Sequence, residues 1–352
     1  MASNNSFHGN RSVEEAEMLK FVFSIESVLI PIIICIGLIG NTISAIVFFQ
    51  PNLRKTSCSL YLGSRAISDN GFLVSLFVIW IHNMRVDVFR APGMCQCEVF
   101  FSYLCAFLSV WYVVWVTVEN YYRICRPFKV ATFCTVRKAK IVICVTLIIG
   151  CCFYFVSLIT TTTSLYRGIR DCVGHRDYML INTILSYGDT LVTLVIPSVV
   201  IILTTGRIVY SLILSFKKKQ APTKKGSGAM QTKVTRLLFF VSLIFLVLNL
   251  PSHTFRLKMT VESWISDSLA QNMTPTNYLL QHLFQQVYYL SFSINFFLYV
   301  TLGESFRQTC LQVFCKGLQG RLQRKRSECT SDKNQSETSV RLLTTNTATG
   351  SG

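Results

Sequence analysis

The chain has 352 residues, of which 51% are hydrophobic and only 14% charged, and its formal net charge is +17. One soluble domain cannot bury that share of apolar residues, so the composition excludes an ordinary soluble protein and favours a membrane protein. The positive charge does not indicate a nucleic-acid partner, because it is divided among short segments between apolar stretches.

Seven apolar stretches are long enough to cross a bilayer, which takes about 20 helical residues. The sequence therefore predicts an all-α membrane protein, a bundle of seven transmembrane helices over residues 21–302. We find no cleavable signal segment ahead of the first stretch and expect the first helix to direct its own insertion. The stretches lie at roughly 21–49, 58–82, 97–123, 139–163, 181–214, 234–257 and 280–302.

Lysine and arginine in the connecting segments predict the orientation, because positive flanks are retained in the cytoplasm. Residues 217–225 carry five lysines and no acid, whereas residues 1–20 hold two basic and three acidic residues. We expect a multi-pass plasma-membrane protein in which residues 1–20 are extracellular and residues 317–352 form a disordered cytoplasmic tail. Anionic membrane lipid and an intracellular protein are the expected partners of the basic charge.

Motifs for covalent modification fit this orientation. Asn4, Asn10 and Asn272 each begin an Asn-x-Ser/Thr triplet on the predicted extracellular side and are candidate glycosylation sites. Residues 303–316 are predicted to form a short amphipathic eighth helix on the inner membrane surface. Within it, Cys310 and Cys315 are candidates for palmitate, with plain thiols as the alternative. Ser and Thr residues of the tail are candidate targets for kinases, with arrestin as a further partner.

Three of the 14 cysteines lie at or near the extracellular side, namely Cys95, Cys97 and Cys172. Cys95 stands 25 residues before Asn120, a helical rise of about 37 Å, which crosses the membrane. A bridge from Cys95 to Cys172 would tie the outer loop over the bundle, and Cys97 is the competing partner.

Ionisable residues inside a predicted span need a partner or a function, because an unpaired charge is costly in the bilayer. Arg65 and Asp69 are four residues apart on one helical face and can pair. The alternative is that Arg65 extends to the inner lipid headgroups. The other two such residues are Glu26 and Asp189.

The order and spacing of several motifs resemble the rhodopsin-like G protein-coupled receptors over nearly the whole chain. "GNTISAIV" is similar to that family's Gly-Asn motif and "RAISD" to its Leu-Ala-x-x-Asp motif, while "ENYYRICRP" is placed like its Asp/Glu-Arg-Tyr motif. "NFFLY" matches Asn-Pro-x-x-Tyr, and the paired cysteines resemble the family's outer disulfide. The matching positions are Asn41, Asp69, Glu119, Asn120, Tyr121, Pro197, Pro251, Asn295 and Tyr299.

The resemblance implies a polar pocket that can hold Na⁺, the only cofactor we consider. A water-filled network that binds no ion is the alternative. The chain also departs from the family, since Asn120 stands in place of an arginine, Asn249 in place of a tryptophan and Phe296 in place of a proline. Arg65, by pairing with Glu119 or Asp69, and Arg123 are rival candidates to replace the missing charge. The sodium candidates are Asn41, Asp69, Ser109 and Asn295.

The resemblance also implies the function, a receptor that binds an extracellular ligand and activates a heterotrimeric G protein, and not an enzyme. Ser102 and Tyr289 replace the residues that amine receptors and light receptors require, so both classes become improbable. The motifs look most like invertebrate neuropeptide receptors, which predicts a peptide ligand. A chemosensory receptor for small organic molecules is the alternative, and a transporter or channel is disfavoured because the chain has no internal repeat. The candidate ligand-binding residues are Ser102, Tyr103, Phe107, Asp189, Arg256, Gln281, Gln285, Tyr288 and Tyr289.

Overall fold

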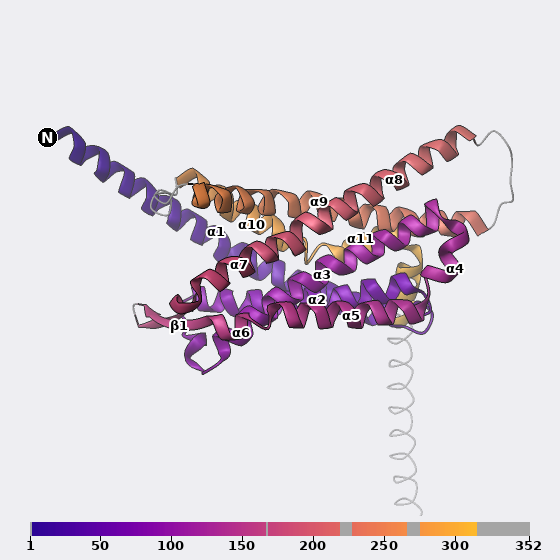
Figure 1. Ribbon diagram of the computed structural model, residues 1–352, viewed down its shortest axis with the longest axis horizontal. Helices are drawn as coiled ribbons and strands as arrows, with labels where there is room; N and C mark the ends of the chain where they lie inside the picture. Colours follow the sequence, from indigo (N-terminus) through magenta and orange to yellow (C-terminus); the bar gives the residue numbers. More distant parts are fainter. Residues whose placement is uncertain (1, 167, 219–226, 266–274, 315–352) are drawn as a thin grey trace, which may run out of the picture.

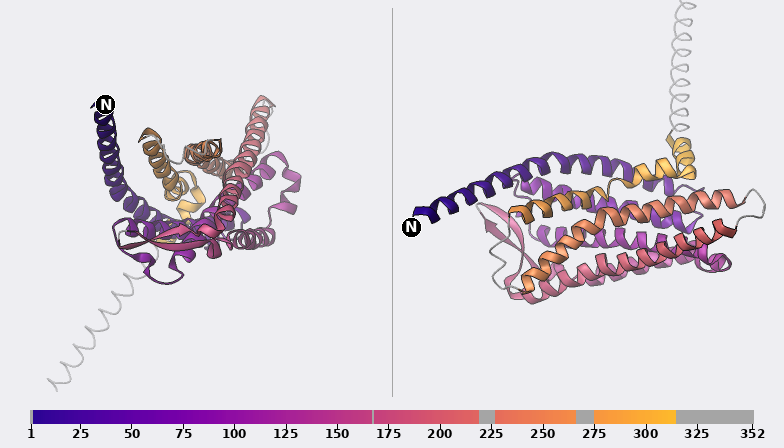
Figure 2. Two further views of the ribbon diagram at one scale, coloured as in Figure 1. Left: turned by 60° about the vertical axis from the view of Figure 1, so that its left-hand side comes forward. Right: turned by 90° about the horizontal axis from the view of Figure 1, so that it is seen from above.

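The computed structural model describes residues 2–166, 168–218, 227–265 and 275–314, most of them helical. The long helices run side by side as one bundle (Figure 1, Figure 2). Within the described residues, six helical stretches are long and apolar enough to cross a membrane. The predicted seventh span is also helical, but a short irregular stretch divides it. The bundle agrees with the predicted fold.

The first half of the bundle consists of three long helices followed by shorter ones. α1, α2 and α3 match the first three predicted spans, and α1 begins already at Ala2, so that the described part of residues 1–20 is helical. α5 and α6 form the fourth span, which ends at Thr160 rather than at residue 163. The bounds are α1 Ala2–Phe48, α2 Ser57–Asn83, η1 Val88–Arg90, α3 Met94–Cys125, η2 Pro127–Lys129, α4 Val130–Phe133, α5 Val136–Tyr154 and α6 Ser157–Thr160.

The second half of the bundle contains two irregular spans and one continuous helix. Span five consists of α7, the wider π-helical turn η4, and α8, and span seven consists of α10 and α11. Residues 304–314 then form the predicted eighth helix. The bounds are η3 Arg176–Tyr178, α7 Met179–Thr190, η4 Leu191–Val195, α8 Ile196–Lys218, α9 Ser227–Ile265, α10 Pro275–Leu290 and α11 Asn295–Leu302.

The two ends of the bundle differ. A β-hairpin and α6 lie at the end toward which the start of α1 projects, and we call this the hairpin end (Figure 1). The opposite end, here the α4 end, holds α4 and the last turns of α8 (Figure 1). In the hairpin, β1 (Thr161–Tyr166) pairs antiparallel with β2 (Ile169–Gly174), with Thr163 opposite Cys172. The sequence patterns predicted a loop here and missed the strands.

Span five bends at a proline. Pro197 has no N–H and its ring crowds the preceding turn, so a regular α-helix cannot continue through it. The five-residue π turn Leu191–Val195 lies directly before α8 and absorbs the mismatch. This local widening directly follows the turn of α7 that carries Asp189.

Span seven is interrupted at residues 291–294, although no proline lies there. Side chains replace the missing helical hydrogen bonds. Asn41 of α1 donates its amide to the carbonyl of Phe292 at 2.7 Å, and Asn295 donates to the carbonyl of Ser291 at 3.0 Å. Irregular backbone at membrane depth is tolerated only when such partners satisfy it.

The outward faces of the bundle are apolar and the inward faces are tightly packed. Ile39, Ile148 and Leu203 are 63%, 61% and 65% exposed, as expected for side chains that meet lipid. Inside, a Cβ at Gly71 of α2 would lie 2.5 Å from the sulfur of Cys105. α2 and α3 therefore approach closely through this glycine, which positions the polar residues described next.

Candidate functional site

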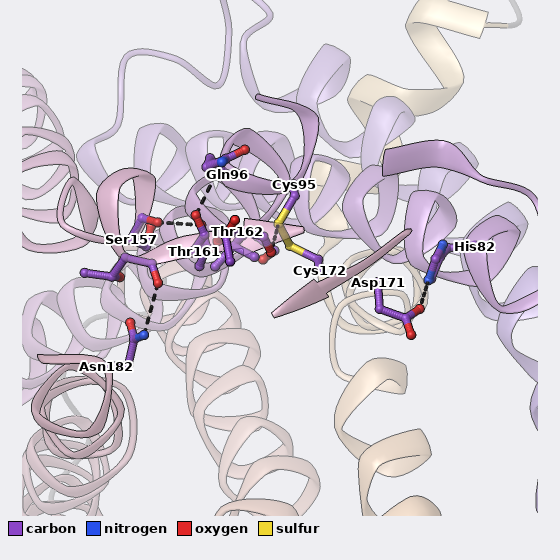
Figure 3. Close-up of a disulfide and its surroundings, with 12 residues drawn as sticks. His82, Cys95, Gln96, Ser157, Thr161, Thr162, Asp171, Cys172 and Asn182 are labelled. Carbon is purple, nitrogen blue, oxygen red and sulfur yellow. Dashed lines mark hydrogen bonds and ion pairs between the residues drawn. A yellow bond between two sulfur atoms is a disulfide. The ribbon is translucent and has the colours of Figure 1, made fainter. Parts of the chain in front are cut away.

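The hairpin end is held together by a disulfide between Cys95 of α3 and Cys172 of β2 (Figure 3). Cys97, the competing partner, is an exposed free thiol. Side chains add further ties: Gln96 donates to the carbonyl of Thr161 at 3.3 Å, and His82 of α2 contacts Asp171 of β2 at 2.9 Å. These contacts fix the hairpin across the ends of α2 and α3.

A cavity of about 170 Å³ lies inside the bundle. Seven of the nine predicted ligand-binding residues line it, contributed by α3, α7, α9 and α10. The structure adds Thr193 and His253, and apolar side chains of α2. The seven predicted residues are Ser102, Tyr103, Asp189, Arg256, Gln285, Tyr288 and Tyr289.

Two further cavities continue from the first toward the outside of the hairpin end. One of about 230 Å³ shares Tyr103 with the inner cavity and is walled by Cys172 and Val173 of the hairpin. The next, of about 480 Å³, shares Asn182 and Ser186 of α7 with the second. The three cavities are therefore adjacent; α7 contributes to the wall of all three, and β2 to the wall of the outer two.

Charged side chains meet at the base of the inner cavity. Asp189 is 4% exposed and lies 3.7 Å from Arg256 of α9, while Tyr154 of α5 donates its hydroxyl to Asp189 at 2.7 Å. His253, one turn before Arg256, packs its ring edge-on against Tyr288. The Asp189–Arg256 pair joins spans five and six directly at the cavity.

Two predicted ligand-binding residues lie elsewhere. Phe107 faces the α5 side of α3, where it packs between Trp111 and Tyr154 and is 4% exposed. Gln281 lies on an exposed face of α10 and does not line the inner cavity. Conversely, the sequence patterns missed Tyr154, because an aromatic residue in an apolar helix carries no sign of the partner that it meets.

Glu26, the ionisable residue of span one, also has partners. His282 of α10 contacts its carboxylate at 2.6 Å, and Gln286 donates to the same oxygen at 3.1 Å. Glu26 therefore links α1 to α10 at the hairpin end of the bundle.

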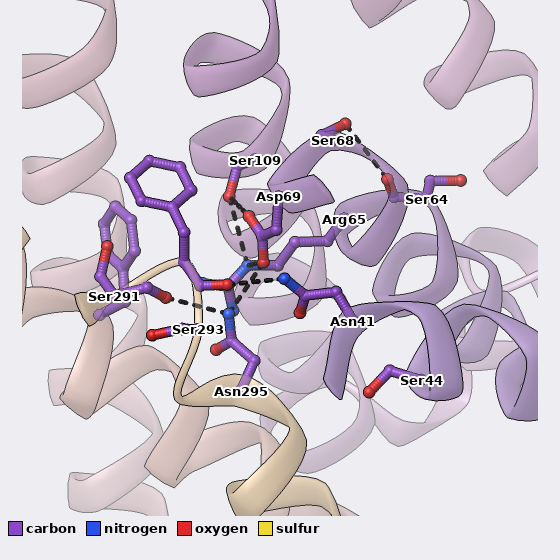
Figure 4. Close-up of polar contacts among 12 residues, drawn as sticks. Asn41, Ser44, Ser64, Arg65, Ser68, Asp69, Ser109, Ser291, Ser293 and Asn295 are labelled. Atoms are coloured by element: carbon purple, nitrogen blue, oxygen red, sulfur yellow. Dashed lines mark hydrogen bonds and ion pairs between the residues drawn. The ribbon is translucent and has the colours of Figure 1, made fainter. Parts of the chain in front are cut away.

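A second polar cluster is buried deeper, between α1, α2, α3 and α11 (Figure 4). Asp69 is fully buried; Ser109 donates its hydroxyl to one carboxylate oxygen, and Asn295 donates its amide to the other at 2.9 Å. Asn41 points its amide at the Phe292 carbonyl instead. The structure thus brings three of the four sodium candidates into direct contact.

Arg65 belongs to the same cluster. Its Nε lies 3.6 Å from Asp69 and 3.5 Å from the Ser109 hydroxyl, and the residue is only 2% exposed. The alternative in which Arg65 extends to the lipid headgroups is therefore wrong. Of the two expected partners, Asp69 and Glu119, Arg65 pairs with Asp69. Arg65 and Asp69 lie on one face of α2, one turn apart.

Glu119 pairs with the rival basic residue. Arg123, one turn later in α3, contacts the Glu119 carboxylate, which also accepts the hydroxyl of Ser57 from α2 at 2.5 Å. Asn120 is 1% exposed, and neither polar atom of its side chain has a hydrogen-bond partner among the described residues. At the position of the family arginine, the structure therefore has a buried neutral amide beside an intrahelical ion pair.

Cys134 directly follows α4, and its side chain contacts the backbone of α3 at Glu119. Its thiol lies 4.0 Å from the carbonyl oxygen of Glu119. Burial, reinforced by the nearby Glu119 charge, raises the pKa of Cys134 to about 11. The thiol is therefore protonated at neutral pH and acts as a weak donor rather than as a nucleophile.

The remaining predicted activation residues lie toward the α4 end or at a helix bend. Tyr299 is 1% exposed and packs against Phe48 and Phe306. Pro251 lies inside α9, and Asn249 just before it donates to the carbonyl of Phe245 at 2.7 Å. Tyr121 is partly exposed and packs edge-on against Tyr122.

The predicted modification sites are described only in part. Asn4 and Asn10 lie in α1, and Cys310 lies partly buried in the helix at 304–314. Asn272 and Cys315 lie outside the described residues. Within the described part of the chain, no group of three or more His, Cys, Asp or Glu side chains is arranged to hold a metal ion.

Comparisons with known proteins agree with this geometry. Residues 40–299 match the profile described as "7 transmembrane receptor (rhodopsin family)". The FMRFamide peptide receptor frpr-18 of Caenorhabditis elegans is 25% identical over 81% of this chain and 68% of its own length. Neuromedin-U receptor 2 of Homo sapiens is 27% identical over 82% and 70%. The thyrotropin-releasing hormone receptor of Ovis aries is 25% identical over 81% and 77%.

The matched region spans the chain from the Gly-Asn motif of α1 to Tyr299, and so includes the spans except for the first part of α1 and the last three residues of α11. It covers well over half of the 352 residues. The chain therefore belongs to the rhodopsin family of seven-transmembrane receptors.

Proposed function

We propose that this receptor binds a peptide through the three adjacent cavities of the hairpin end and activates a heterotrimeric G protein at the α4 end. The observation that supports the proposal is the adjacency of the cavities, since Tyr103 lines both the first and the second and Asn182 lines both the second and the third. A small molecule is accommodated by the inner cavity alone, whereas an extended chain of several residues can occupy all three.

The lining of the cavities suits a peptide. Backbone amides need donors and acceptors, which Gln285, Asn182 and Ser186 supply, and side chains need aromatic surfaces, which Tyr288 and Tyr289 supply. His253 leaves Nε2 without a hydrogen-bond partner among the described residues, so that it is available to a ligand. The three relatives named above, a receptor named for the FMRFamide peptide and two named for neuromedin-U and thyrotropin-releasing hormone, support the same ligand class.

The test is a screen of peptide libraries on cells that express the receptor, read out by G protein activation. We expect a peptide agonist. Its potency should fall when residues are removed from the end of the peptide that lies outside the inner cavity. A response to small organic molecules, with silence toward every peptide, would favour the chemosensory alternative. Electrical recording from the same cells separates a receptor from a channel.

A blocking variant sharpens the test. Ser186→Trp places a bulky ring where the second and third cavities meet, and we expect it to reduce the potency of a long agonist far more than that of its truncated fragment. Ile184→Trp is the matched control, because Ile184 lies in the same helix but is 61% exposed on another face.

The G protein would bind where the α4 end carries positive charge. Ligand binding in the cavity favours an arrangement in which the inner half of α9 moves outward, and the Glu119–Arg123 pair then rearranges. The Asp189–Arg256 contact supports this coupling, because it joins span five to the α9 helix at the ligand cavity. Position 120 holds asparagine, so we assign to Arg123 the positive charge that meets the G protein. The Arg123 side chain is 18% exposed and lies about one turn nearer the α4 end than Asn120 does.

The same proposal fixes the orientation and the remaining partners. The hairpin end, with Asn4 and Asn10 as glycosylation sites, is extracellular, and the tail is cytoplasmic, where kinases and arrestin act. Anionic lipid binds at the α4 end, where Arg54, Lys55 and Lys140 line a cavity of about 740 Å³ together with Phe49 and Leu60. Basic groups beside an apolar wall suit a lipid headgroup and its chain.

A further inference from the structure

The buried cluster around Asp69 contains a cation that belongs to the chain itself. Arg65 places Nε 3.6 Å from the Asp69 carboxylate and 3.5 Å from the Ser109 hydroxyl (Figure 4). Arg65 and Asp69 are 2% and 0% exposed, so solvent does not screen their attraction. The carboxylate therefore has a permanent positive partner at short range.

The other side chains of the cluster present hydrogen atoms, not oxygen lone pairs, to the carboxylate. Ser109 donates its hydroxyl to Asp69, and Asn295 turns its NH₂ group toward it at 2.9 Å. Asn41 donates away from the cluster, to the Phe292 carbonyl at 2.7 Å. A hard cation such as Na⁺ needs several oxygen atoms directed at one point, whereas here Asn41 Oδ1 is the buried side-chain oxygen of the cluster that lacks a hydrogen-bond partner among the described residues.

Charge leads to the same conclusion. An isolated buried carboxylate attracts a cation strongly, but here the net charge of Arg65 and Asp69 together is zero. A sodium ion at the carboxylate would also lie close to the guanidinium, and like charges at such a distance in a buried site repel. The residues present therefore do not fit a bound sodium ion.

We propose that Arg65 is a built-in counter-ion that takes the place of a diffusible cation at Asp69, so that the stability of this receptor is independent of sodium. A diffusible ion can leave when the helices rearrange, whereas Arg65 is tethered to α2. Its charge can move only between neighbouring acceptors, such as the Asp69 carboxylate and the Ser109 hydroxyl. Arg65 thus connects α2 to α3, and through Asp69 it is linked to Asn295 of α11.

The test uses the purified receptor and needs no ligand, so its outcome is independent of the proposed peptide function. The melting temperature is measured in sodium chloride and in an equal concentration of choline chloride. We expect the same value for the unaltered receptor in both salts. A clear rise in sodium that Asp69→Asn abolishes would overturn the proposal.

A variant without the built-in charge provides the second arm. Arg65→Leu leaves Asp69 buried without its counter-ion, and we expect this variant to melt several degrees lower in choline and to regain part of the loss in sodium. Arg65→Leu/Asp69→Asn, which removes both charges, should melt at the same temperature in the two salts. If Arg65→Leu melts as the unaltered receptor does in choline, Asp69 does not need Arg65 and the proposal fails. If Arg65→Leu does not fold, the comparison of salts on the unaltered receptor still decides.

Discussion

Asp189 of the inner cavity has two polar partners. It pairs with Arg256 and accepts a hydrogen bond from the Tyr154 hydroxyl. Asp189→Asn removes the charge and leaves Arg256 without that partner. Asp189 is 4% exposed but the Arg256 side chain is 43% exposed, so losing this pair costs less than losing a fully buried one, about 1–2 kcal/mol, and we expect agonist potency to fall about tenfold. Concentration–response curves at matched surface expression measure the change.

Tyr154→Phe separates the hydrogen bond from the charge. It deletes only the hydroxyl that Asp189 accepts, a change of about 1 kcal/mol, and should weaken the agonist less than Asp189→Asn does. Tyr112→Phe is the control, because Tyr112 is a buried tyrosine of α3 that does not line the cavity. Equal potencies for all three variants would remove Asp189 from the ligand site.

Arg123 supports a second prediction at the residue scale. Glu119 is 6% exposed and depends on Arg123 for its positive partner. Arg123→Gln leaves a buried charge unpaired, and we expect it to destabilise the receptor by about 1–3 kcal/mol, below the range for fully buried pairs because Arg123 is partly exposed. Adding Glu119→Gln should recover most of the melting temperature, since it removes the stranded charge. Additive losses would show that the two residues do not interact.

At the scale of elements, the disulfide and the hairpin form a lid that walls the second cavity, next to the inner one. The bridge joins residues 77 apart in the sequence, and closing a loop of that length stabilises a protein by up to about 4 kcal/mol in the chain-entropy view. We expect Cys95→Ser/Cys172→Ser to lower the melting temperature and to abolish the agonist response. Cys97→Ser, at an exposed free thiol of the same helix, should change neither. An unaltered response in the double variant would exclude the lid from ligand binding.

The helical elements themselves were largely predictable from hydropathy, because each span needs about 20 apolar residues regardless of its neighbours. The irregular elements were not. The break at 291–294 depends on Asn41, which is distant in sequence, and the β-hairpin depends on a disulfide and on Gln96. Both are produced by tertiary contacts that no local pattern contains.

The candidate site was predictable to a similar degree. Family spacing located Asp69, Ser109 and Asn295, which the structure brings together, and seven residues of the inner cavity. It could not decide between Asp69 and Glu119 as the partner of Arg65, because that choice depends on which face of α2 meets α3. For the same reason it could not show that Phe107 packs against Tyr154 and does not line the inner cavity.

At the scale of the whole molecule, the orientation gives a direct prediction. An epitope tag before residue 2 should be accessible on intact cells, and a tag after residue 352 only after permeabilisation, because basic segments are retained inside. Treatment with an endoglycosidase should increase gel mobility, and Asn4→Gln/Asn10→Gln should reduce that increase. Accessibility of the C-terminal tag on intact cells would reverse the assigned topology.

The position of Arg65 within one helix has a consequence for biosynthesis. A charged side chain at the centre of an inserting helix costs about 2.5–3.5 kcal/mol on translocon scales, and α2 carries two. Because Arg65 and Asp69 lie four apart on α2, they can neutralise each other before α3 or α11 has been made. Exchanging Asp69 and Asn70 keeps the composition but moves the acid off that face, and should lower the yield of inserted α2 in a translocation assay. The spacing that positions the receptor's internal cation thus also makes its second helix acceptable to the insertion machinery.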